Sequence, residues 1–393
     1  MNKQLQKLFK IAQKEERLIV GLMSGTSVDG LDLALCWVYG HGEHTQLAVE
    51  RFLTIPYQEH TIARVKNVQS KGNVNEQELC VLNTLLGDLH AQMVLYSLEK
   101  WGVQPQDVDL IASHGQTIYH APQHVHQEIG VGHTTLQIGD GDHIAQGTGI
   151  ITIADVRQKH TAAGGEGAPL APVFDQLLFR HADEHRVLLN LGGIANFTWL
   201  PSTGSQLKVM ATDTGPANTI VNEAMQQLYD RDYDHQGEVA IQGTVIMPWL
   251  EELKSHSFFA QPAPKSTGQE LFNLKWATSL NSYPSDAKPE DTVATLSELT
   301  VETVMQTIQK ILKGEKAEIF VSGGGVHNRY MMQGITKGLP GCTVSLVQDL
   351  GISPDAKEAC MMAVFANELV AGEGFKIDDL DTTLHLGKIC LPG

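Results

Sequence analysis

The most informative hydrophobic pattern in the chain is a pair of apolar runs, residues 18–20 and 31–38, on either side of a turn rich in Gly, Ser, Thr and Asp. Two apolar strands joined by a small-residue turn are typical of a β-hairpin. The tip of such a hairpin exposes backbone N–H groups that can converge on an anion. The turn also carries Asp29 and Asp32, which would repel a bare phosphate but accept one bridged by a divalent cation. A plain structural turn explains the same residues, so both interpretations stay open at this point.

Strand-like and helix-like patterns alternate along the rest of the chain, which predicts an α/β fold. Residues 79–100 carry leucines at helical spacing and are followed by Gly102, so we expect a long helix that ends there. Helical spacing also predicts helices within residues 1–17 and 291–313. Short apolar runs predict buried strands at residues 109–112, 150–154, 187–191, 207–211 and 318–321.

Two further glycine turns follow predicted strands. One holds Gly192 and Gly193 between two apolar runs, and so repeats the pattern of the first hairpin in other residues. The other holds Gly323, Gly324 and Gly325 before a predicted helix. Two hairpins in separate halves of the chain could hold a polyphosphate from both sides of a cleft, and glycine lets a base and ribose approach the backbone closely. The sequence contains no P-loop, no dinucleotide-binding fingerprint and no nucleophile elbow.

Asp213 is the candidate general base. It follows an apolar run and precedes a predicted helix that extends through Tyr229. Amide groups at a helix N-terminus favour an ionised carboxylate, which can take a proton from a hydroxyl or a water molecule. The same position suits an Asp that only caps the helix, and the residues alone favour neither interpretation.

Polar residues at another predicted strand end form a second candidate cluster. His114, Gln116 and Thr117 are expected to face a ligand, because sites in α/β sheets gather at the carboxyl ends of strands. A buried histidine bonded to the backbone explains His114 equally well. Arg157 could pair with a substrate carboxylate or with a surface acid. From the sequence alone, Glu358 is an ordinary helix residue.

The composition of the chain excludes some classes of binding partner. The formal net charge of −17 at pH 7 argues against nucleic acid and against an anionic membrane surface, and no apolar run is long enough to span a membrane. The five cysteines are scattered without a C-x-x-C pair, which indicates a reduced, cytoplasmic compartment. Residues 1–17 form an amphipathic helix rather than a signal peptide. The histidines of residues 120–133 indicate a solvated loop more than a metal site, and the sequence leaves the ligands of any metal ion unknown.

In order along the chain, these motifs resemble the anhydro-N-acetylmuramic acid kinases, a family of the actin/Hsp70/hexokinase-like superfamily. The resemblance runs from about residue 18 to the C-terminus. The motifs that carry it are GLMSGTSVDG (21–30), SHGQTI (113–118), LQIGD (136–140), GGEGAPL (164–170), LNLGGIAN (189–196), DTGPAN (213–218) and PKSTG (264–268).

The resemblance implies an α/β fold of two actin-like (ribonuclease H-like) domains flanking a cleft for ATP and substrate. Domain I is expected at residues 1–154 and 370–393, and domain II at residues 155–369. The resemblance assigns Gly25, Thr26, Ser27, Val28, Asp29, Gly30, Leu31 and Asp32 to the ATP-phosphate hairpin, Gly192 and Gly193 to a second phosphate loop, and Gly323, Gly324 and Gly325 to the adenosine side.

The resemblance also implies an ATP-dependent enzyme with Mg²⁺ as cofactor and a homodimeric state. Members of the family open the 1,6-anhydro bridge of the amino sugar with water and phosphorylate the freed O6, which serves the recycling of cell-wall peptidoglycan. Asp213 corresponds to the carboxylate that activates the water, Thr117 and Glu358 to residues that contact the sugar, and Arg157 to a position near the substrate.

Three positions depart from the usual family pattern: His160 where Asp is usual, Glu166 where Gln is usual, and Gln269 where Arg is common. These changes leave the sugar preference open. Two alternatives therefore accompany the main hypothesis: an ordinary sugar kinase acting on a free hydroxyl, and a non-catalytic sensor of ATP or sugar with the same fold.

Overall fold

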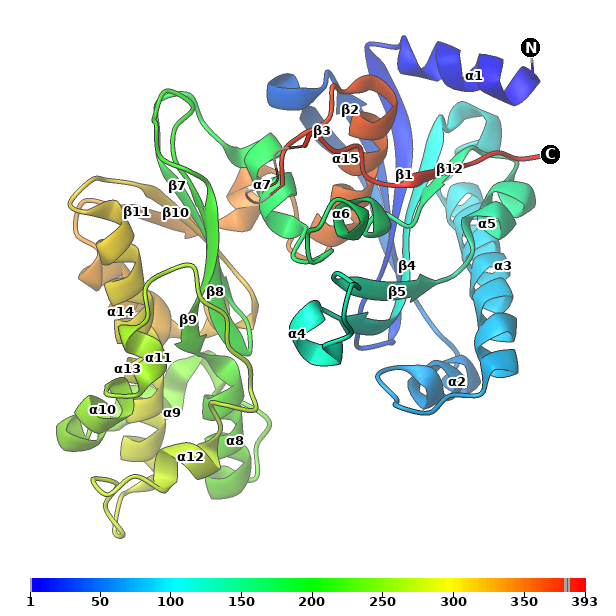
Figure 1. Cartoon of the computed structure of the whole chain (residues 1–393). Coiled ribbons are helices and arrows are strands. Elements are labelled where there is room, and N and C mark those ends of the chain that lie inside the picture. Colours follow the sequence, from blue (N-terminus) through cyan, green and yellow to red (C-terminus); the bar gives the residue numbers. More distant parts are fainter. Residues whose placement is uncertain (1, 378–379, 381) are drawn as a thin grey trace. The chain divides into compact units, whose positions relative to one another are not determined.

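A computed structural model describes residues 2–377, 380 and 382–393 of the protein. Met1, at the start of the predicted N-terminal helix, and Asp378, Asp379 and Asp381, in the predicted C-terminal segment of domain I, lie outside the described residues. Contacts within the chain define two compact units (Figure 1). Unit 1 comprises Met1–Leu178 and Gly351–Gly393, and unit 2 comprises Phe179–Leu350.

Unit 1 is built on a seven-stranded sheet in the order β12-β6-β4-β1-β2-β3, with β5 paired to β4. The strands are β1 (Glu16–Ser24), β2 (Gly30–Tyr39), β3 (Gln46–Pro56), β4 (Leu110–Ala121), β5 (Thr134–Ile138), β6 (Thr152–Ala154) and β12 (Lys388–Cys390). Strands β1, β2 and β3 are antiparallel, whereas β4 runs parallel to β1, and β6 runs parallel to β4. The carboxyl ends of β1, β4 and β6 therefore meet at one edge of the sheet.

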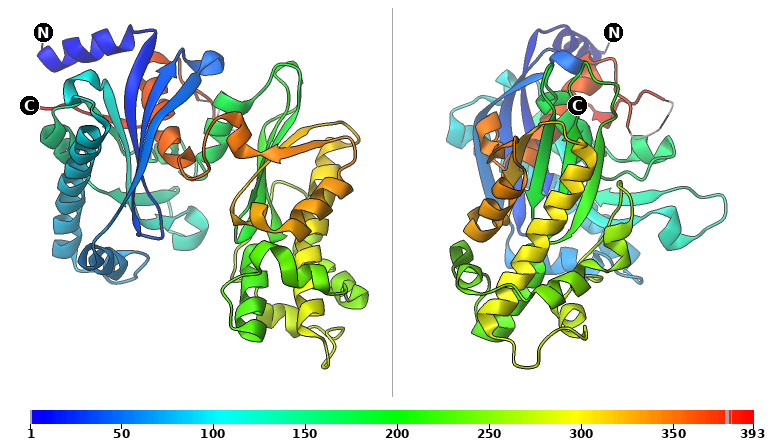
Figure 2. Two further views of the ribbon diagram at one scale, coloured as in Figure 1. Left: turned by 180° about the vertical axis from the view of Figure 1, so that it is seen from behind. Right: turned by 90° about the vertical axis from the view of Figure 1, so that its left-hand side faces the viewer.

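Helices cover both faces of this sheet. Helices α3 (Glu76–Trp101) and α5 (Gly141–Thr148) lie on one face and α15 (Lys357–Ala371) lies on the other (Figures 1 and 2). A Cβ on Gly21 of β1 would overlap the backbone of Ala359, so the glycine lets α15 lie directly on the strand. The other elements of the unit are α1 (Lys3–Ala12), α2 (Glu59–Val68), α4 (Gln123–His126), α6 (Gln158–Ala162), α7 (Ala171–Phe179, which reaches the first residue of unit 2) and the 3₁₀ turns η1 (Gly42–His44) and η2 (Pro105–Asp107).

Unit 2 is built on a five-stranded sheet in the order β11-β10-β7-β8-β9. The strands are β7 (Arg186–Leu191), β8 (Ile194–Leu200), β9 (Met210–Pro216), β10 (Glu318–Ser322) and β11 (Thr343–Leu346). Strands β7, β8 and β9 are antiparallel, and β10 runs parallel to both β7 and β11. In this sheet, β7, β8, β9, β10 and β11 take the places that β1, β2, β3, β4 and β6 take in the sheet of unit 1.

The apolar core of unit 2 lies between its sheet and helices led by α13 (Pro289–Leu312), which runs alongside the strands in Figure 2. Trp249 is fully buried in this core, and its indole nitrogen donates to the carbonyl of Ala277 at 2.9 Å. The other elements are α8 (Asn218–Tyr229), η3 (His235–Gly237), α9 (Glu238–Gln242), α10 (Met247–Lys254), α11 (Ser257–Ala260), α12 (Leu274–Thr278), η4 (Gly324–His327), α14 (Arg329–Gly338) and η5 (Val347–Leu350).

The α/β class predicted from the sequence is confirmed. The order of an antiparallel three-strand meander followed by parallel strands, found in both sheets, is that of a ribonuclease H-like unit. The predicted first hairpin forms between β1 and β2, and the helix predicted at residues 79–100 is α3, capped by Gly102 in the left-handed conformation. In the described part of the chain, no helix is long and apolar enough to cross a membrane.

The compact units differ from the predicted domain boundaries at residues 154/155 and 369/370. Residues 155–178 and 351–369 belong to unit 1 because both segments are held there. Arg157 donates to His114 of β4, and α15 packs on β1, where Gly21 leaves room for the backbone of Ala359. The predicted cleft between two domains stays a prediction.

Candidate active site

The β1–β2 hairpin displays its backbone at the surface of unit 1. Val28 adopts a positive φ of 60° and is fully buried, which is rare for a β-branched residue and holds the turn in one conformation. Its side chain joins the apolar core of the unit, whereas Thr26, Ser27 and Asp29 remain exposed. The anchored valine therefore leaves the polar tip free to meet a ligand.

Two carboxyl groups near this hairpin, those of Asp32 and Glu358, have a raised pKa. Burial is the main cause of the raised pKa of Asp32, repulsion from Asp29 and Asp355 adds to it, and a 2.6 Å hydrogen bond from Thr54 opposes it. The Glu358 side chain is exposed, yet the protein around it raises its pKa, chiefly by desolvation. Asp32 adds to that rise, and Arg157 opposes it. This acidic region of unit 1 favours a cation.

Arg157 is fixed by two hydrogen bonds. Its Nε donates to Nε2 of His114 at 2.8 Å, and its Nη1 donates to the carbonyl of Gly167 at 2.6 Å. Because a guanidinium can only donate, Nε2 of His114 accepts, so Nδ1 carries the ring proton and donates to the carbonyl of Gly115 at 2.9 Å. Burial, with the nearby charge of Arg157, lowers the pKa of His114 to about 3. His114 is thus the buried, neutral histidine that the sequence left as one alternative.

Thr117 and Gln116 are neighbours on β4 with different environments. Thr117 is half-buried, and its Oγ1 accepts a hydrogen bond from Gln137 of β5 at 3.2 Å. The Thr117 hydroxyl proton is therefore available for another acceptor. Gln116 is fully buried and bonds to Ser24 and to the carbonyl of Gly25. The expectation that Gln116 faces a ligand is therefore wrong, because the β1–β2 hairpin occupies its amide.

In unit 2, Asp213 lies within strand β9, opposite Asn196 of β8. The alternative that it caps a helix is wrong, because α8 begins at Asn218 with Ala217 as its cap. The backbone N–H of Thr267 donates to Oδ2 of Asp213 at 2.8 Å, and the N–H of Asp213 donates to the carbonyl of Lys265 at 2.9 Å. Burial raises the pKa of Asp213, and the bond from Thr267 opposes that rise. A raised pKa makes the carboxylate a stronger base.

Gly192 and Gly193 form the two-residue turn between β7 and β8. Their carbonyls accept hydrogen bonds from the first amides of the α8 region: Asn218 donates to Gly192, and Ala217 donates to Gly193, each at 3.0 Å. A Cβ on Gly193 would overlap the hydroxyl of Thr219, so the close approach of turn and helix requires a residue without a side chain.

The glycines after β10 serve two purposes. A Cβ on Gly323 would lie 2.7 Å from the carbonyl carbon of Leu191, and one on Gly325 would lie 2.5 Å from the Cβ of Leu191. These two glycines therefore allow packing against the end of β7. A Cβ on Gly324 would meet only the Asn218 side chain, at 3.7 Å. Of the three glycines, Gly324 has the most room for a ligand.

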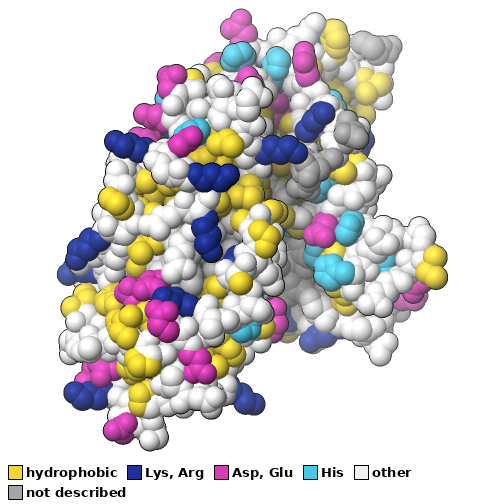
Figure 3. Space-filling view, turned by 60° about the vertical axis from the view of Figure 1, so that its left-hand side comes forward, with side chains coloured by type: hydrophobic (Ala, Val, Ile, Leu, Met, Phe, Trp, Pro, Cys, Tyr) yellow, Lys and Arg dark blue, Asp and Glu magenta, His cyan; other side chains and the backbone are white. Residues whose placement is uncertain are grey.

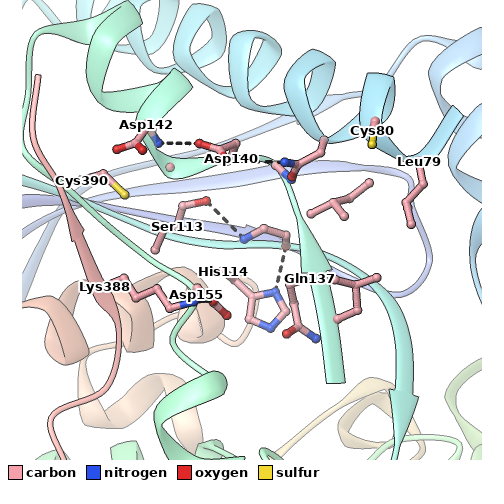
Figure 4. Close-up of a pocket in the computed structure, with 17 residues that line it drawn as sticks. Leu79, Cys80, Ser113, His114, Gln137, Asp140, Asp142, Asp155, Lys388 and Cys390 are labelled. Atoms are coloured by element: carbon pink, nitrogen blue, oxygen red, sulfur yellow. Dashed lines mark hydrogen bonds and ion pairs between the residues drawn. The ribbon is translucent and has the colours of Figure 1, made fainter. Parts of the chain in front are cut away.

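One cavity of unit 1 lies beside His114. It measures about 420 Å³ and is bordered by Ser113, His114 and Gln137, with the Asp155–Lys388 ion pair at another side (Figure 4). Of the residues that the sequence predicted to face a ligand, His114 lines this cavity, whereas Asp213, Thr117, Arg157 and Glu358 do not.

The histidine-rich segment lies in an exposed arm formed by α4 and the ends of β4 and β5, where Figure 3 shows histidine side chains gathered. His133 approaches Glu166 at 3.8 Å, and His126 bonds to the carbonyl of Gly132. Within the described residues, no three His, Cys, Asp or Glu side chains form a group that could hold a metal ion.

Sequence reasoning missed Thr267, which holds Asp213, and Gln69, which bonds to the carbonyls of Thr26 and Thr117. Thr267 lies in the PKSTG motif, whose residues were not assigned individual roles. No signal in the sequence marks Gln69, which follows the last residue of α2.

Two units with the same strand order, each with a glycine-containing hairpin after its first strand, define the class: an actin-like protein built from two ribonuclease H-like units. The model of the family described as anhydro-N-acetylmuramic acid kinase matches residues 17–378. The chain belongs to this family.

Named relatives agree with this assignment. A protein named anhydro-N-acetylmuramic acid kinase from Pseudoalteromonas atlantica is 44% identical over 100% of both chains. One of the same name from Caldanaerobacter subterraneus subsp. tengcongensis is 38% identical over 98% of this chain and 100% of its own. Among solved structures, an activator of 2-hydroxyisocaproyl-CoA dehydratase from Clostridium difficile with bound ADPNP matches at 13% identity and a TM-score of 0.41, over 90% of this chain and 96% of that chain.

Proposed function

We propose that the protein is an ATP-dependent kinase that hydrolytically opens 1,6-anhydro-N-acetylmuramic acid and phosphorylates O6, which yields N-acetylmuramic acid 6-phosphate and ADP. Family membership and the names of the relatives support this activity. The single structural observation that carries it is Asp213, a half-buried carboxylate with a raised pKa whose orientation is fixed by the N–H of Thr267. A place in peptidoglycan recycling follows from the substrate.

Asp213 acts as the general base in this proposal. It takes a proton from a water molecule as the water oxygen bonds to the anomeric carbon and the bond from that carbon to O6 breaks. The freed O6 then bonds to the γ-phosphorus of ATP, and ADP leaves. The proton on Asp213 returns to solvent. The bond from Thr267 holds Oδ2, so Oδ1 is the oxygen that takes the proton.

The hairpin of residues 25–32 is proposed to bind the ATP phosphates, Gly192 and Gly193 to form a second phosphate loop, and the turn at Gly324 to lie on the adenosine side. The acidic set of Asp29 and Asp32 fits Mg²⁺, because Mg²⁺ commonly takes one or two protein carboxylates together with phosphate oxygens. The mutual repulsion of these carboxyls is what a bound cation would relieve. Bound Mg²⁺ would neutralise charge that develops on the transferring phosphoryl group.

Three residues of unit 1 are proposed to bind the sugar. Arg157, held by His114 and Gly167, keeps Nη2 for a carboxylate, and a muramic acid sugar carries one on its lactyl group. Thr117 offers its hydroxyl proton, and Glu358 offers an accessible carboxylate for sugar hydroxyls. The matching family positions support these roles.

A homodimer in the cytoplasm completes the proposal. Net charge and scattered thiols support the compartment, and the family resemblance supports the dimer. Light scattering on the purified protein measures its mass in solution, and a monomer at all concentrations would exclude the dimer.

The test is ADP release by the purified protein with Mg-ATP and either 1,6-anhydro-N-acetylmuramic acid or N-acetylmuramic acid. Turnover with the anhydro sugar alone supports the proposal. Turnover with the open sugar would instead identify an ordinary sugar kinase. Binding of ATP and sugar without turnover would identify a sensor.

A further inference from the structure

Two glutamine side chains hold the carbonyls at the tip of the β1–β2 hairpin. The amide nitrogen of Gln116 donates to the carbonyl of Gly25 at 3.0 Å, and that of Gln69 donates to the carbonyl of Thr26 at 3.2 Å. Gln116 reaches the hairpin from β4, and Gln69 reaches it from the residue that follows α2. Both glutamines belong to unit 1.

These bonds determine where the amides of the tip point. In a planar trans peptide, the C=O of one residue and the N–H of the next point in opposite directions. Because the carbonyls of Gly25 and Thr26 point toward the glutamines, the N–H groups of Thr26 and Ser27 point away from them. Both residues are exposed, so their amides are presented to an anion.

The same two amide nitrogens also contact the sugar-binding strand. Gln116 donates to the carbonyl of Thr117 at 3.4 Å and Gln69 donates to it at 3.3 Å. A side-chain amide carries two N–H donors, so each glutamine can serve the hairpin and Thr117 at once. One carbonyl of β4 is thereby tied to two carbonyls of the hairpin.

A chain of buried groups fixes the orientation of Gln116. Ser24 donates to its Oε1 at 2.6 Å, which turns its amide nitrogen toward the hairpin. The hydroxyl of Tyr57 donates to Ser24 at 2.9 Å and lies 2.7 Å from the ring of His90. Ser24, Gln116 and His90 are fully buried and Tyr57 is nearly so, so this chain cannot rearrange without opening the core.

Unit 2 holds its equivalent hairpin differently. There the carbonyls of Gly192 and Gly193 accept from backbone amides at the start of α8. In unit 1, side chains that also contact a neighbouring strand replace those helix amides. We propose that Gln69 and Gln116 are positioning residues that couple the phosphate hairpin to Thr117, so that nucleotide and sugar each strengthen the binding of the other. This inference rests on the proposed function, which assigns nucleotide to the hairpin and sugar to Thr117.

Gln69 is the residue to test, because it is partly exposed and its replacement spares the buried chain. Gln69→Met keeps the size of the side chain and removes both donors. Gln77→Met, at an exposed position on α3, is the matched control. Calorimetric titration of 1,6-anhydro-N-acetylmuramic acid, with and without Mg²⁺ and a non-hydrolysable ATP analogue, measures the coupling. The coupling factor is the ratio of the sugar affinities with and without the analogue. Titration of the analogue, with and without the sugar, must give the same factor.

In the wild-type protein and in Gln77→Met, we expect the nucleotide analogue to tighten sugar binding by about fivefold or more, as is common for coupled sites. In Gln69→Met, the factor should fall below about twofold, with the affinity for sugar alone nearly unchanged. A purely structural role would lower the thermal midpoint and leave the factor intact, which would overturn the inference.

Different results would contradict the proposed function and the coupling between nucleotide and sugar. If the wild-type protein binds neither ligand, the proposed function fails, and the inference fails with it. If it binds both ligands and turns over but shows no coupling, the inference alone is wrong.

Discussion

At the scale of single residues, the candidate chemistry depends on what holds each polar group. Asp213 is oriented by a backbone N–H from a distant segment, and Arg157 is oriented by a neutral histidine and a carbonyl. In both cases, these hydrogen bonds leave one polar atom of the side chain for a ligand: Oδ1 of Asp213 and Nη2 of Arg157. Residues elsewhere in the sequence thus determine which atom is available.

Asp213→Asn is expected to lower kcat by about 10²- to 10⁴-fold, the usual contribution of a general base, with little change in KM for either substrate. In the wild type, kcat should rise with pH through the raised pKa of Asp213, because only the deprotonated carboxylate accepts a proton. Steady-state ADP release measures both effects. Asp232→Asn, an exposed change in the same unit, is the control. Unchanged turnover in Asp213→Asn would remove Asp213 from the role of base.

Two buried histidines should make the fold sensitive to acid. Burial lowers the pKa of His90 to about 4 and that of His114 to about 3, from an ordinary 6.5. At pH values between the lowered pKa of each folded histidine and the ordinary pKa of 6.5, the unfolded chain binds more protons than the folded one. The free energy of unfolding therefore falls as pH decreases below about 6.5. Each histidine contributes up to about 1.4 kcal/mol per pH unit.

Urea unfolding of the wild type and of His90→Gln between pH 4.5 and 7.5 measures this acid sensitivity. The variant should show a shallower loss of stability toward acid, since it lacks one titrating group. Parallel curves would mean that His90 is protonated in the folded state.

Sequence reasoning located these residues better than it located their partners. Asp213 and Arg157 stand out by type and place, but the contact of Asp213 with Thr267 joins positions 54 residues apart. Gln116 was misjudged for a related reason: a polar residue at a strand end faces a ligand or another loop, and only the folded hairpin decides which.

At the scale of elements, the tight contact between α15 and β1 leaves no room for a side chain. At Gly21, the missing side chain makes room for the backbone of Ala359. The alternation of apolar runs predicted β1, β2, α3 and α13 well, because each carries a long pattern on one face. It placed the strand before α8 too early: the pairing with β8 extends β9 through Asp213 to Pro216.

Gly21→Ala should reduce the free energy of unfolding by about 1–3 kcal/mol, the range for overpacked cores, because the added methyl group forces helix and strand apart. Gly72→Ala serves as the control, since a Cβ there meets nothing within 4 Å. Denaturant unfolding of both variants gives the comparison. Equal stability of the two would show that α15 shifts without strain.

At the scale of the whole molecule, the chain enters unit 1, crosses to unit 2 and returns. Unit 2 is therefore one continuous segment, whereas unit 1 is assembled from two. The sequence indicated two domains, but its predicted boundaries differ from both points where the chain passes between the units. The hydrophobic pattern of a helix shows that it packs on a sheet, but it does not show which sheet.

A fragment of residues 179–350 is expected to fold alone, because it contains a complete sheet and its own core. A fragment of residues 1–178 lacks α15 and β12 and should remain poorly folded. Circular dichroism during heating distinguishes the two: a cooperative transition is expected only for the first. Cooperative unfolding of residues 1–178 would show that unit 1 is complete without its returning segment.

The return of the chain to unit 1 also sets an order of events on the ribosome. Strand β1 emerges early, but α15, which covers it, is made only after all of unit 2. Strand β1 ends at Ser24 and α15 begins at Lys357, so at 5–20 residues per second the wait is on the order of 15–70 s. During that interval, the apolar face of β1 and β2 has no native cover. The growing chain should therefore be a client of the chaperones that meet nascent polypeptides, and its yield should depend on their supply more than that of a protein whose domains are finished in sequence.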